Sequence, residues 1–292
     1  QMCQKNHYNA CGRSILQTKK MELIDIGCNL THDSFDIDRG EVIEAAIEAG
    51  VTRMVITGAS ANGSRAALEL AEQWPQTLFA TAGVHPHRAS QYDDETDALI
   101  RQLSGHEEVV AIGETGLDYF RDFSPRDAQR SAFERQIQIA IETGLPFFLH
   151  QRDAHDDFMA ILKNYRDRLS NVVVHCFTGS RDELFEYLDL NCHIGITGWI
   201  CDERRGTHMK EFMFDIPADR LMIETDAPYL KPRNLRPKVK SHRNEPRLLP
   251  WILGTLAACR NEHPPTLAET TTRNAVRFFR LPPVNDVDQH AD

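Results

Sequence analysis

Short apolar runs alternate with longer amphipathic stretches from Met21 onward. The runs are rich in β-branched residues, which is typical of strands, and the stretches between them repeat apolar positions at helical spacing. In the longest stretch, Ser124-Pro125 predicts a helix start and Gly144 a helix end. The predicted strands cover residues 22–30, 52–58, 78–85, 109–116, 146–151, 171–177, 192–198 and 220–226.

This alternation predicts a (β/α)8 TIM barrel, because eight strand-then-helix units over about 250 residues match the count of that fold. A doubly wound sheet would also alternate, but it usually has fewer strands and a glycine-rich phosphate turn. Neither GxGxxG nor GxxxxGK[ST] occurs in the chain, and no break in composition indicates a second domain. We therefore predict one barrel domain over residues 21–281 and a polar tail at 282–292.

Residues 1–20 do not share this pattern. They contain no Asp or Glu and no apolar run long enough for a secretory signal. We predict a disordered leader or a start-site extension here, with a weak organelle presequence as the alternative, and we leave the segment out of the barrel.

Composition narrows the classes of function. The 292 residues include 43 acidic and 33 basic side chains, a net charge of −10, which argues against non-specific coating of nucleic acid. Seven scattered cysteines without a CxxC pair fit reduced thiols and a cytoplasmic location. No apolar run reaches the roughly 18 residues of a membrane-spanning helix. We expect a monomer that does not associate with a membrane.

Five ionisable residues fall on the predicted strands in a way that indicates a metal centre. Asp25 lies in the first strand, and Glu114, His150, His175 and Asp226 lie near the ends of four others. In a barrel these ends surround one face, where such folds carry their chemistry. Imidazole and carboxylate ligands together suit Zn²⁺, Mn²⁺ or Mg²⁺, and two ions about 3.5–4 Å apart can activate water and clamp a phosphoryl group. Without a cation, burying these groups would be costly.

Nine segments, in order from about Met21 to Arg280, resemble the TatD family of metal-dependent deoxyribonucleases. They are DIGCNL (25–30), GVHPH (83–87), AIGETGLDY (111–119), FLHQRDAH (148–155), VHCFTGS (174–180), GITGW (195–199), CDERRG (201–206), ETDAPYLKP (224–232) and RNEP (243–246). The resemblance implies a TIM barrel of the amidohydrolase type. It also implies a cytoplasmic 3′–5′ exonuclease that cuts single-stranded DNA, with RNA as an alternative, and serves DNA repair or degradation. Mg²⁺ is the expected cofactor, with Mn²⁺ or Zn²⁺ as alternatives.

The resemblance also implies roles for particular residues. The bridging carboxylate of the family matches Glu114, its two histidine ligands match His150 and His175, and its catalytic or metal-binding aspartate matches Asp226. We expect Asp226 and Glu114 to be catalytic.

The first predicted strand departs from the family pattern. Many members carry Asp-x-His-x-His there, whereas this chain has Asp25, Gly27 and Asn29 at the corresponding positions. Gly27 offers no ligand and Asn29 only an amide. We therefore expect one firm metal site on the His150–His175 side and a weaker one near Asp25 and Glu114.

A basic run, residues 231–243, follows Asp226 and contains six Lys or Arg and no acidic residue. Such runs are usually solvated surface, but this position favours contacts with substrate phosphates. Asp118 and Glu224 either orient ligands or bond to backbone. Four aromatic residues could stack bases, although core packing is the commoner role: Tyr119, Phe177, Trp199 and Tyr229. The predicted substrate-binding residues are His85, Arg204, Arg205, Arg236, Lys238, Lys240 and Arg243.

Two other functions stay open at this point. One is a small-molecule amidohydrolase on the same barrel, against which the basic run argues, because a small neutral substrate needs no phosphate contacts. The other is a catalytically impaired nucleic-acid-binding protein, whose only support is the missing histidine pair of the first strand.

Overall fold

The computed structural model describes residues 21–237 and 241–282, so the predicted leader and most of the predicted polar tail lie outside the described residues. Its core is one sheet of eight parallel strands, in which each strand pairs with the next along the chain. The strands are β1 (Leu23–Cys28), β2 (Val51–Ile56), β3 (Leu78–Ala82), β4 (Val109–Asp118), β5 (Phe147–Arg152), β6 (Val172–Val174), β7 (His193–Ile196) and β8 (Leu221–Ile223).

The two outer strands of this sheet, β1 and β8, come together and nearly close it. Just beyond β8, the Asp226 N–H donates to the Gly27 carbonyl at 2.8 Å. On the other side of the junction, the Asn29 N–H donates to the Ala227 carbonyl at 2.6 Å. The predicted TIM barrel is therefore confirmed.

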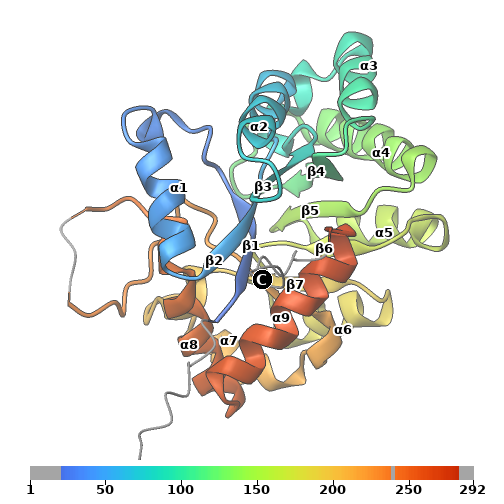
Figure 1. Cartoon of the computed structure of the whole chain (residues 1–292). Coiled ribbons are helices and arrows are strands. Elements are labelled where there is room, and N and C mark those ends of the chain that lie inside the picture. Colours follow the sequence, from blue (N-terminus) through green and yellow to red (C-terminus); the bar gives the residue numbers. More distant parts are fainter. Residues whose placement is uncertain (1–20, 238–240, 283–292) are drawn as a thin grey trace, which may run out of the picture.

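Helices surround the strands, and one further helix lies across an end of the barrel (Figure 1). The long helix predicted from Ser124-Pro125 begins at Arg126 and ends before Gly144, whose φ of +66° is the left-handed conformation expected of such a stop. The helices are α1 (Arg39–Glu48), α2 (Ala61–Gln73), α3 (Asp94–Leu103), α4 (Arg126–Thr143), α5 (His155–Tyr165), α6 (Arg181–Asp189), α7 (Thr207–Lys210), α8 (Leu249–Arg260) and α9 (Pro264–Phe279).

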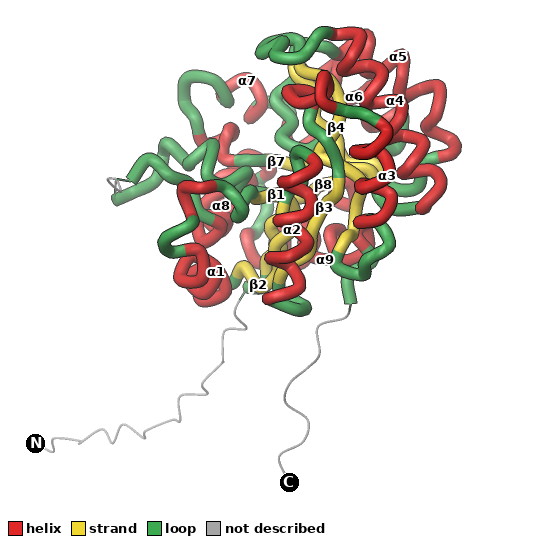
Figure 2. The backbone as a smooth tube through the Cα atoms, turned by 90° about the horizontal axis from the view of Figure 1, so that it is seen from above, coloured by secondary structure: helices red, strands yellow, loops and turns green. Residues whose placement is uncertain are grey.

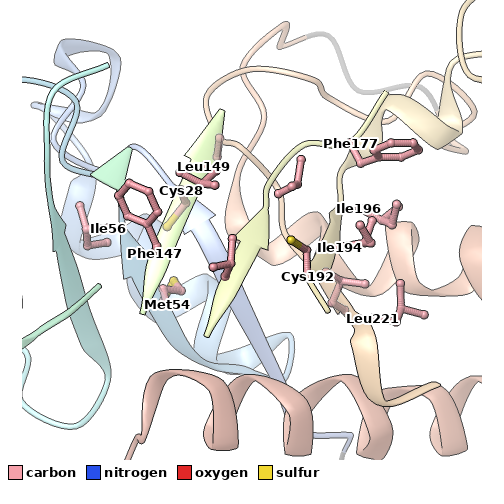
Figure 3. Close-up of a cluster of buried hydrophobic side chains, with 14 of the residues drawn as sticks. Cys28, Met54, Ile56, Phe147, Leu149, Phe177, Cys192, Ile194, Ile196 and Leu221 are labelled. Atoms are coloured by element: carbon pink, nitrogen blue, oxygen red, sulfur yellow. The ribbon is translucent and has the colours of Figure 1, made fainter. Parts of the chain in front are cut away.

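Alternation along the strands divides the core into two layers. Phe147 and Leu149 of β5 belong to the outer layer between strands and helices, part of which Figure 3 shows. Between them, Phe148 belongs to an inner layer that also contains Val173 of β6. Because side chains two residues apart share a face of a strand, His150 follows Phe148 on the inner side.

Helix α9 closes the barrel at the amino ends of its strands. Phe278 and Phe279 pack into the inner layer with Ile24 and Val110, which lie at the starts of β1 and β4. Both ends of the described chain lie on this side of the molecule (Figure 2). The opposite end, where the strands finish, is left for polar side chains. In the part of the chain that the structure describes, no helix is long and apolar enough to cross a membrane.

Candidate metal centre

Three imidazoles converge on one carboxylate oxygen at the carboxyl end of the barrel. Glu114 Oε1 lies 2.7 Å from His175 Nε2 and 3.1 Å from His150 Nδ1. A third imidazole comes from the turn after β3, where His85 Nε2 lies 3.3 Å from the same oxygen. The structure thus brings together four of the residues selected from the sequence, each from a different strand end.

These side chains are buried, and their pKa values show strong mutual dependence. Burial raises the pKa of Glu114, but the charges and hydrogen bonds of the surrounding imidazoles outweigh it and hold that pKa well below the usual range. Burial lowers the pKa of His175, but Glu114 and Glu224 together hold it well above the ordinary value. For His85 burial prevails, and its pKa falls to about 4. A ligand histidine must be neutral, so His85 is ready to coordinate at neutral pH.

Asp226 follows β8 and completes the rim next to these imidazoles. Its backbone has a φ of +55°, which is uncommon outside glycine. Burial, together with the negative charges of Glu114 and Glu224, raises the pKa of its carboxyl group to about 8, although His175 opposes this shift. A carboxyl group with such a pKa in a cluster of acids and imidazoles marks a place where a cation would be strongly favoured.

Asp118 supports the cluster from behind. Its Oδ2 lies 3.3 Å from His150 Nε2 and 2.8 Å from His87 Nε2. Because Nε2 of His150 faces Asp118, Nδ1 is the nitrogen that faces Glu114. A carboxylate behind a ligand histidine is the usual way to fix the orientation of its ring.

Glu224 occupies the space that a side chain at position 27 would need. A Cβ atom built on Gly27 would lie only 2.5 Å from Glu224 Oε2. That carboxylate is fully buried, lies 3.3 Å from His175 Nδ1, and accepts the Cys176 N–H at 2.5 Å. Next to Gly27, the chain therefore has a buried glutamate that directly follows β8 and touches the ring of His175.

The carboxylate of Asp25 is hydrogen-bonded to Thr225, just after β8, rather than to the imidazoles. Its Oδ1 accepts the Thr225 N–H at 2.9 Å, and its Oδ2 accepts the Thr225 hydroxyl at 2.5 Å. Burial raises the pKa of Asp25 to about 7 despite these bonds. Within the described residues, no hydrogen bond or ion pair joins Asp25 to Glu114 or to a histidine, and its role as a ligand stays a prediction.

Among the predicted phosphate contacts, several cations already have acidic partners. Arg204 Nη2 lies 3.2 Å from Asp202 Oδ2, and Arg243 Nη2 lies 2.6 Å from Asp38 Oδ2. By contrast, the guanidinium of Arg205 lies 5.5 Å from the ring centre of Trp199. Arg236 donates to the carbonyl of the residue before it. Lys238 and Lys240 lie outside the described residues.

Two buried glutamines of α4 were missed by the sequence analysis, although they hold the rim in place. Gln136 Oε1 accepts the Val84 N–H at 2.7 Å, and its Nε2 donates to the Thr115 hydroxyl at 2.7 Å. Gln129 Oε1 accepts the Asp118 N–H at 2.8 Å. Both amides fix the chain next to cluster residues. The sequence could have indicated them, because two polar residues seven apart lie on the face of α4 that also carries the apolar residues Phe133 and Ala140.

The donor set fits a divalent cation. Ligand atoms of His85, Glu114 and His150 all lie within 4.8 Å of one another, with His175 and Asp226 beside them. Mixed imidazole and carboxylate donors are the set that Zn²⁺, Mn²⁺ and Mg²⁺ sites use. A cation would also balance the buried negative charge of Glu114, Glu224 and Asp226.

Comparison with known proteins finds relatives over almost the whole barrel. The family described as "TatD related DNase" matches residues 24–280. A relative from Erwinia billingiae named "3′-5′ ssDNA/RNA exonuclease TatD" is 49% identical over 260 residues, which cover 89% of this chain and 100% of the relative. The protein of the same name from Erwinia tasmaniensis is 51% identical over 259 residues, again 89% of this chain and 100% of the relative.

Among solved structures, YJJV, described as a TatD homolog from Escherichia coli K12, superposes with a TM-score of 0.81 and 27% identity over 90% of this chain and 99% of that chain. A hydrolase of the TatD family from Entamoeba histolytica gives a TM-score of 0.78 and 28% identity over 88% of this chain and 98% of that chain.

Proposed function

The chain belongs to the TatD-related DNase family, and from this premise we propose that it is a metal-dependent 3′–5′ exonuclease that hydrolyses phosphodiester bonds of single-stranded DNA or RNA. One observation carries the proposal: the nitrogens of His85, His150 and His175 all lie within 3.3 Å of Glu114 Oε1 at the carboxyl end of the barrel. The near-complete overlap with relatives named as such exonucleases supports the choice of substrate.

The residues that would hold the metal are those of the cluster. We assign Glu114, His150, His175 and Asp226 as ligands, His85 as a ligand or substrate contact, and Asp25 as a ligand or support. Mg²⁺ is the expected ion, with Mn²⁺ or Zn²⁺ as alternatives. When bound, a divalent ion supplies positive charge for the scissile phosphate and lowers the pKa of water.

We infer one firm metal site and one weaker site. Glu114, His150 and His175 offer a compact set of donors for the firm site. The weaker site would be the one that loses its first-strand ligands through Gly27 and Asn29. Glu224, which fills the space next to Gly27, can supply charge there but is itself engaged with Cys176 and His175.

The chain's own groups divide the remaining work. We assign to Asp226 the acceptance of a proton from the attacking water, because a cation bound beside it would keep its carboxylate ionised. Asp118 keeps the ring of His150 oriented through Nε2. We propose Arg205, Arg236, Lys238 and Lys240 as contacts of the substrate backbone. Arg204 and Arg243 could join them only by releasing Asp202 or Asp38.

A set of three variants tests the assignment of the centre. We expect His150→Ala and His175→Ala to lose bound metal and nuclease activity together, because each removes a ligand. Asp226→Asn should mainly remove turnover, because the amide still fills the space of the carboxylate and offers an oxygen to the metal but cannot accept a proton. Metal content by elemental analysis and cleavage of a single-stranded oligonucleotide report the two properties separately. His263→Ala, on the exposed surface and in neither group of residues that could hold a metal ion, is the matched control. Near-normal activity in either ligand variant would overturn the assignment.

The location and assembly of the protein are proposals of the same kind. We propose a cytoplasmic monomer. The cysteines at positions 28, 176, 192, 201 and 259, which are those within the described residues, are all free thiols, in keeping with a reducing compartment. A role in DNA repair or degradation stays a prediction.

A further inference from the structure

The arginines around the carboxyl end of the barrel fall into two groups. Arg204, Arg233 and Arg243 form ion pairs with acidic side chains, so much of their charge is already neutralised. Arg121, Arg152 and Arg205 instead lie against aromatic rings, and within residues 21–237 and 241–282 none of these three forms an ion pair. The charge of the second group therefore has no acidic partner there and is available to an anionic ligand.

The second group forms a continuous surface with three aromatic rings. The guanidinium carbon of Arg152 lies 3.9 Å from the ring centre of Phe120 and 6.0 Å from that of Trp199. Arg205 lies 5.5 Å from the same ring of Trp199. Arg121 lies 5.8 Å from Phe120 and 6.0 Å from Phe123. We call Phe120, Phe123, Trp199, Arg121, Arg152 and Arg205 the arginine–aromatic platform.

Two of the platform's rings are exposed to an extent that folding alone does not explain. Phe120 is 53% exposed and Phe123 is 66% exposed. Both lie in the loop between β4 and α4, directly after Asp118, which contacts His150. Burying a phenylalanine side chain stabilises a protein, so two neighbouring exposed rings indicate a surface that a ligand covers.

The platform lies next to the candidate metal centre. The ring of Phe123 is 4.9 Å from that of His87, whose Nε2 lies 2.8 Å from Asp118. Phe120, Arg152 and Trp199 also line a cavity of about 390 Å³. Its wall includes Gln151, the residue after His150, and Val174, the residue before His175. The cavity therefore lies along the two strands that lead to His150 and His175, and its volume falls within the range of small-ligand pockets.

We propose that the arginine–aromatic platform binds unpaired nucleobases of the substrate next to the bond that is cut, by stacking them on Phe120, Phe123 and Trp199. This inference rests on the proposed function and names the surface that recognises a single strand. Every base has a flat π-face, so stacking on rings and guanidinium planes holds a strand without reading its sequence. Bases inside a duplex are stacked on each other, so the platform favours single strands over blunt duplex ends.

The experiment compares two probes on the full-length protein in EDTA, where binding can be measured without hydrolysis. One probe is a 5′-labelled thymidine oligonucleotide, and the other has the same phosphates but abasic residues at its last three 3′ positions. Fluorescence anisotropy gives the dissociation constant of each. We expect wild-type protein to bind the base-bearing probe about fivefold to 100-fold more tightly, which is the range for stacking of one base.

Variants locate this preference on the platform. Phe120→Ala and Phe123→Ala change exposed side chains, so the fold should survive them. Each should weaken binding of the base-bearing probe and leave binding of the abasic probe unchanged, while Phe120→Trp should keep the preference. Phe185→Ala is the matched control, because Phe185 is also exposed, at 42%, and also lies under an arginine, Arg181, but among the described residues no ring or arginine contact joins it to the platform. It should change neither constant.

The outcomes separate this inference from the proposed function. Equal binding of both probes by wild-type protein, or an equal loss for both probes in Phe120→Ala, would overturn the platform. Cleavage of the base-bearing probe is assayed in parallel with Mg²⁺ and Mn²⁺. If wild-type protein cleaves the base-bearing probe but binds both probes equally, the proposed nuclease activity stands and the proposed platform is wrong. If the protein prefers the base-bearing probe but cleaves it with neither ion, the proposed platform stands and the proposed exonuclease activity is wrong.

Discussion

At the scale of single residues, the pairing of Gly27 with Glu224 explains why the first strand carries a glycine instead of a side chain next to the metal centre. The first strand lacks the expected histidines, and the structure gives a steric reason. The Glu224 carboxylate lies where a side chain at position 27 would begin. Gly195 lies on the other side of this carboxylate, and a Cβ atom built on Gly195 would be only 2.6 Å from Glu224 Oε1. A side chain at position 27 and the buried carboxylate of Glu224 therefore cannot occupy this space together.

This steric relation predicts a compensating pair of substitutions. Gly27→Ala should destabilise the protein by about 1–3 kcal/mol, because the new methyl group displaces a buried, hydrogen-bonded carboxylate. Glu224→Gly in the same chain should relieve the steric clash, so the two effects should not add. Urea unfolding of the single and double variants measures this coupling. Strictly additive losses would show that the two positions do not share one space.

A second residue-scale prediction concerns His193 at the start of β7. Its ring packs 4.9 Å from that of Phe278, its Nδ1 is buried without a hydrogen-bond partner in the part of the chain that is described, and burial lowers its pKa to about 4. The unfolded chain, with a histidine pKa of about 6.5, therefore binds more protons than the folded one between pH 6.5 and pH 4. The free energy of unfolding falls as pH falls through this window.

Replacing the His193 imidazole with a side chain that does not titrate should remove this loss of stability at low pH. Between pH 7.5 and pH 5, wild-type protein should lose about 1–2 kcal/mol more stability than His193→Gln, since glutamine does not titrate. Urea unfolding at both pH values gives the comparison, and titration of other groups cancels between the two proteins. Parallel pH profiles would mean that His193 titrates alike in the folded and unfolded states.

The residues of the centre were predicted from the sequence to very different degrees. Glu114, His150, His175 and Asp226 stood out because they follow apolar runs whose ends must meet in a barrel. Glu224 and Asp118 were seen but could equally have bonded to backbone, since sequence does not give side-chain direction. The contact of Asp25 with Thr225 joins the first strand to the last, and no local pattern indicates such a pair.

At the scale of elements, α4 does more than cover the barrel. Its buried face carries two amides that replace apolar side chains, and these amides hold the segments that present His85 and Asp118. Strands and helices were predictable from the periodicity of apolar residues and from residues that end helices, such as Gly144. Rim loops were not, because side chains from distant elements fix their shape.

The role of α4 can be tested at Gln136. Gln136→Leu keeps the size of the side chain but leaves the Val84 N–H and the Thr115 hydroxyl buried without their partner. We expect a loss of about 1–3 kcal/mol in the free energy of unfolding and weaker metal binding, because Val84 precedes His85. Calorimetric titration of metal into metal-stripped variant protein measures the metal affinity. Gln138→Leu, on the same helix, is the matched control. Lost stability with unchanged metal affinity would make Gln136 purely structural.

At the scale of the whole molecule, an acidic protein is proposed to hold an anionic strand. The net charge of −10 opposes such binding at long range, so recognition has to be local. The basic run seen in the sequence is partly neutralised by Glu203 and Asp38, a feature that could not be predicted because those acids lie far from it in the chain. The barrel itself was predictable, since eight alternating units allow few other topologies.

The measurement that tests the central claim most directly is cleavage of a 5′-labelled single-stranded oligonucleotide by metal-stripped protein, with divalent ions added back one at a time. The account predicts no cleavage without metal, and with Mg²⁺ or Mn²⁺ a ladder of labelled products that shorten step by step from the 3′ end. The same ladder should be absent for His150→Ala. Intact oligonucleotide with every ion, or immediate release of the labelled 5′ nucleotide, would contradict the account.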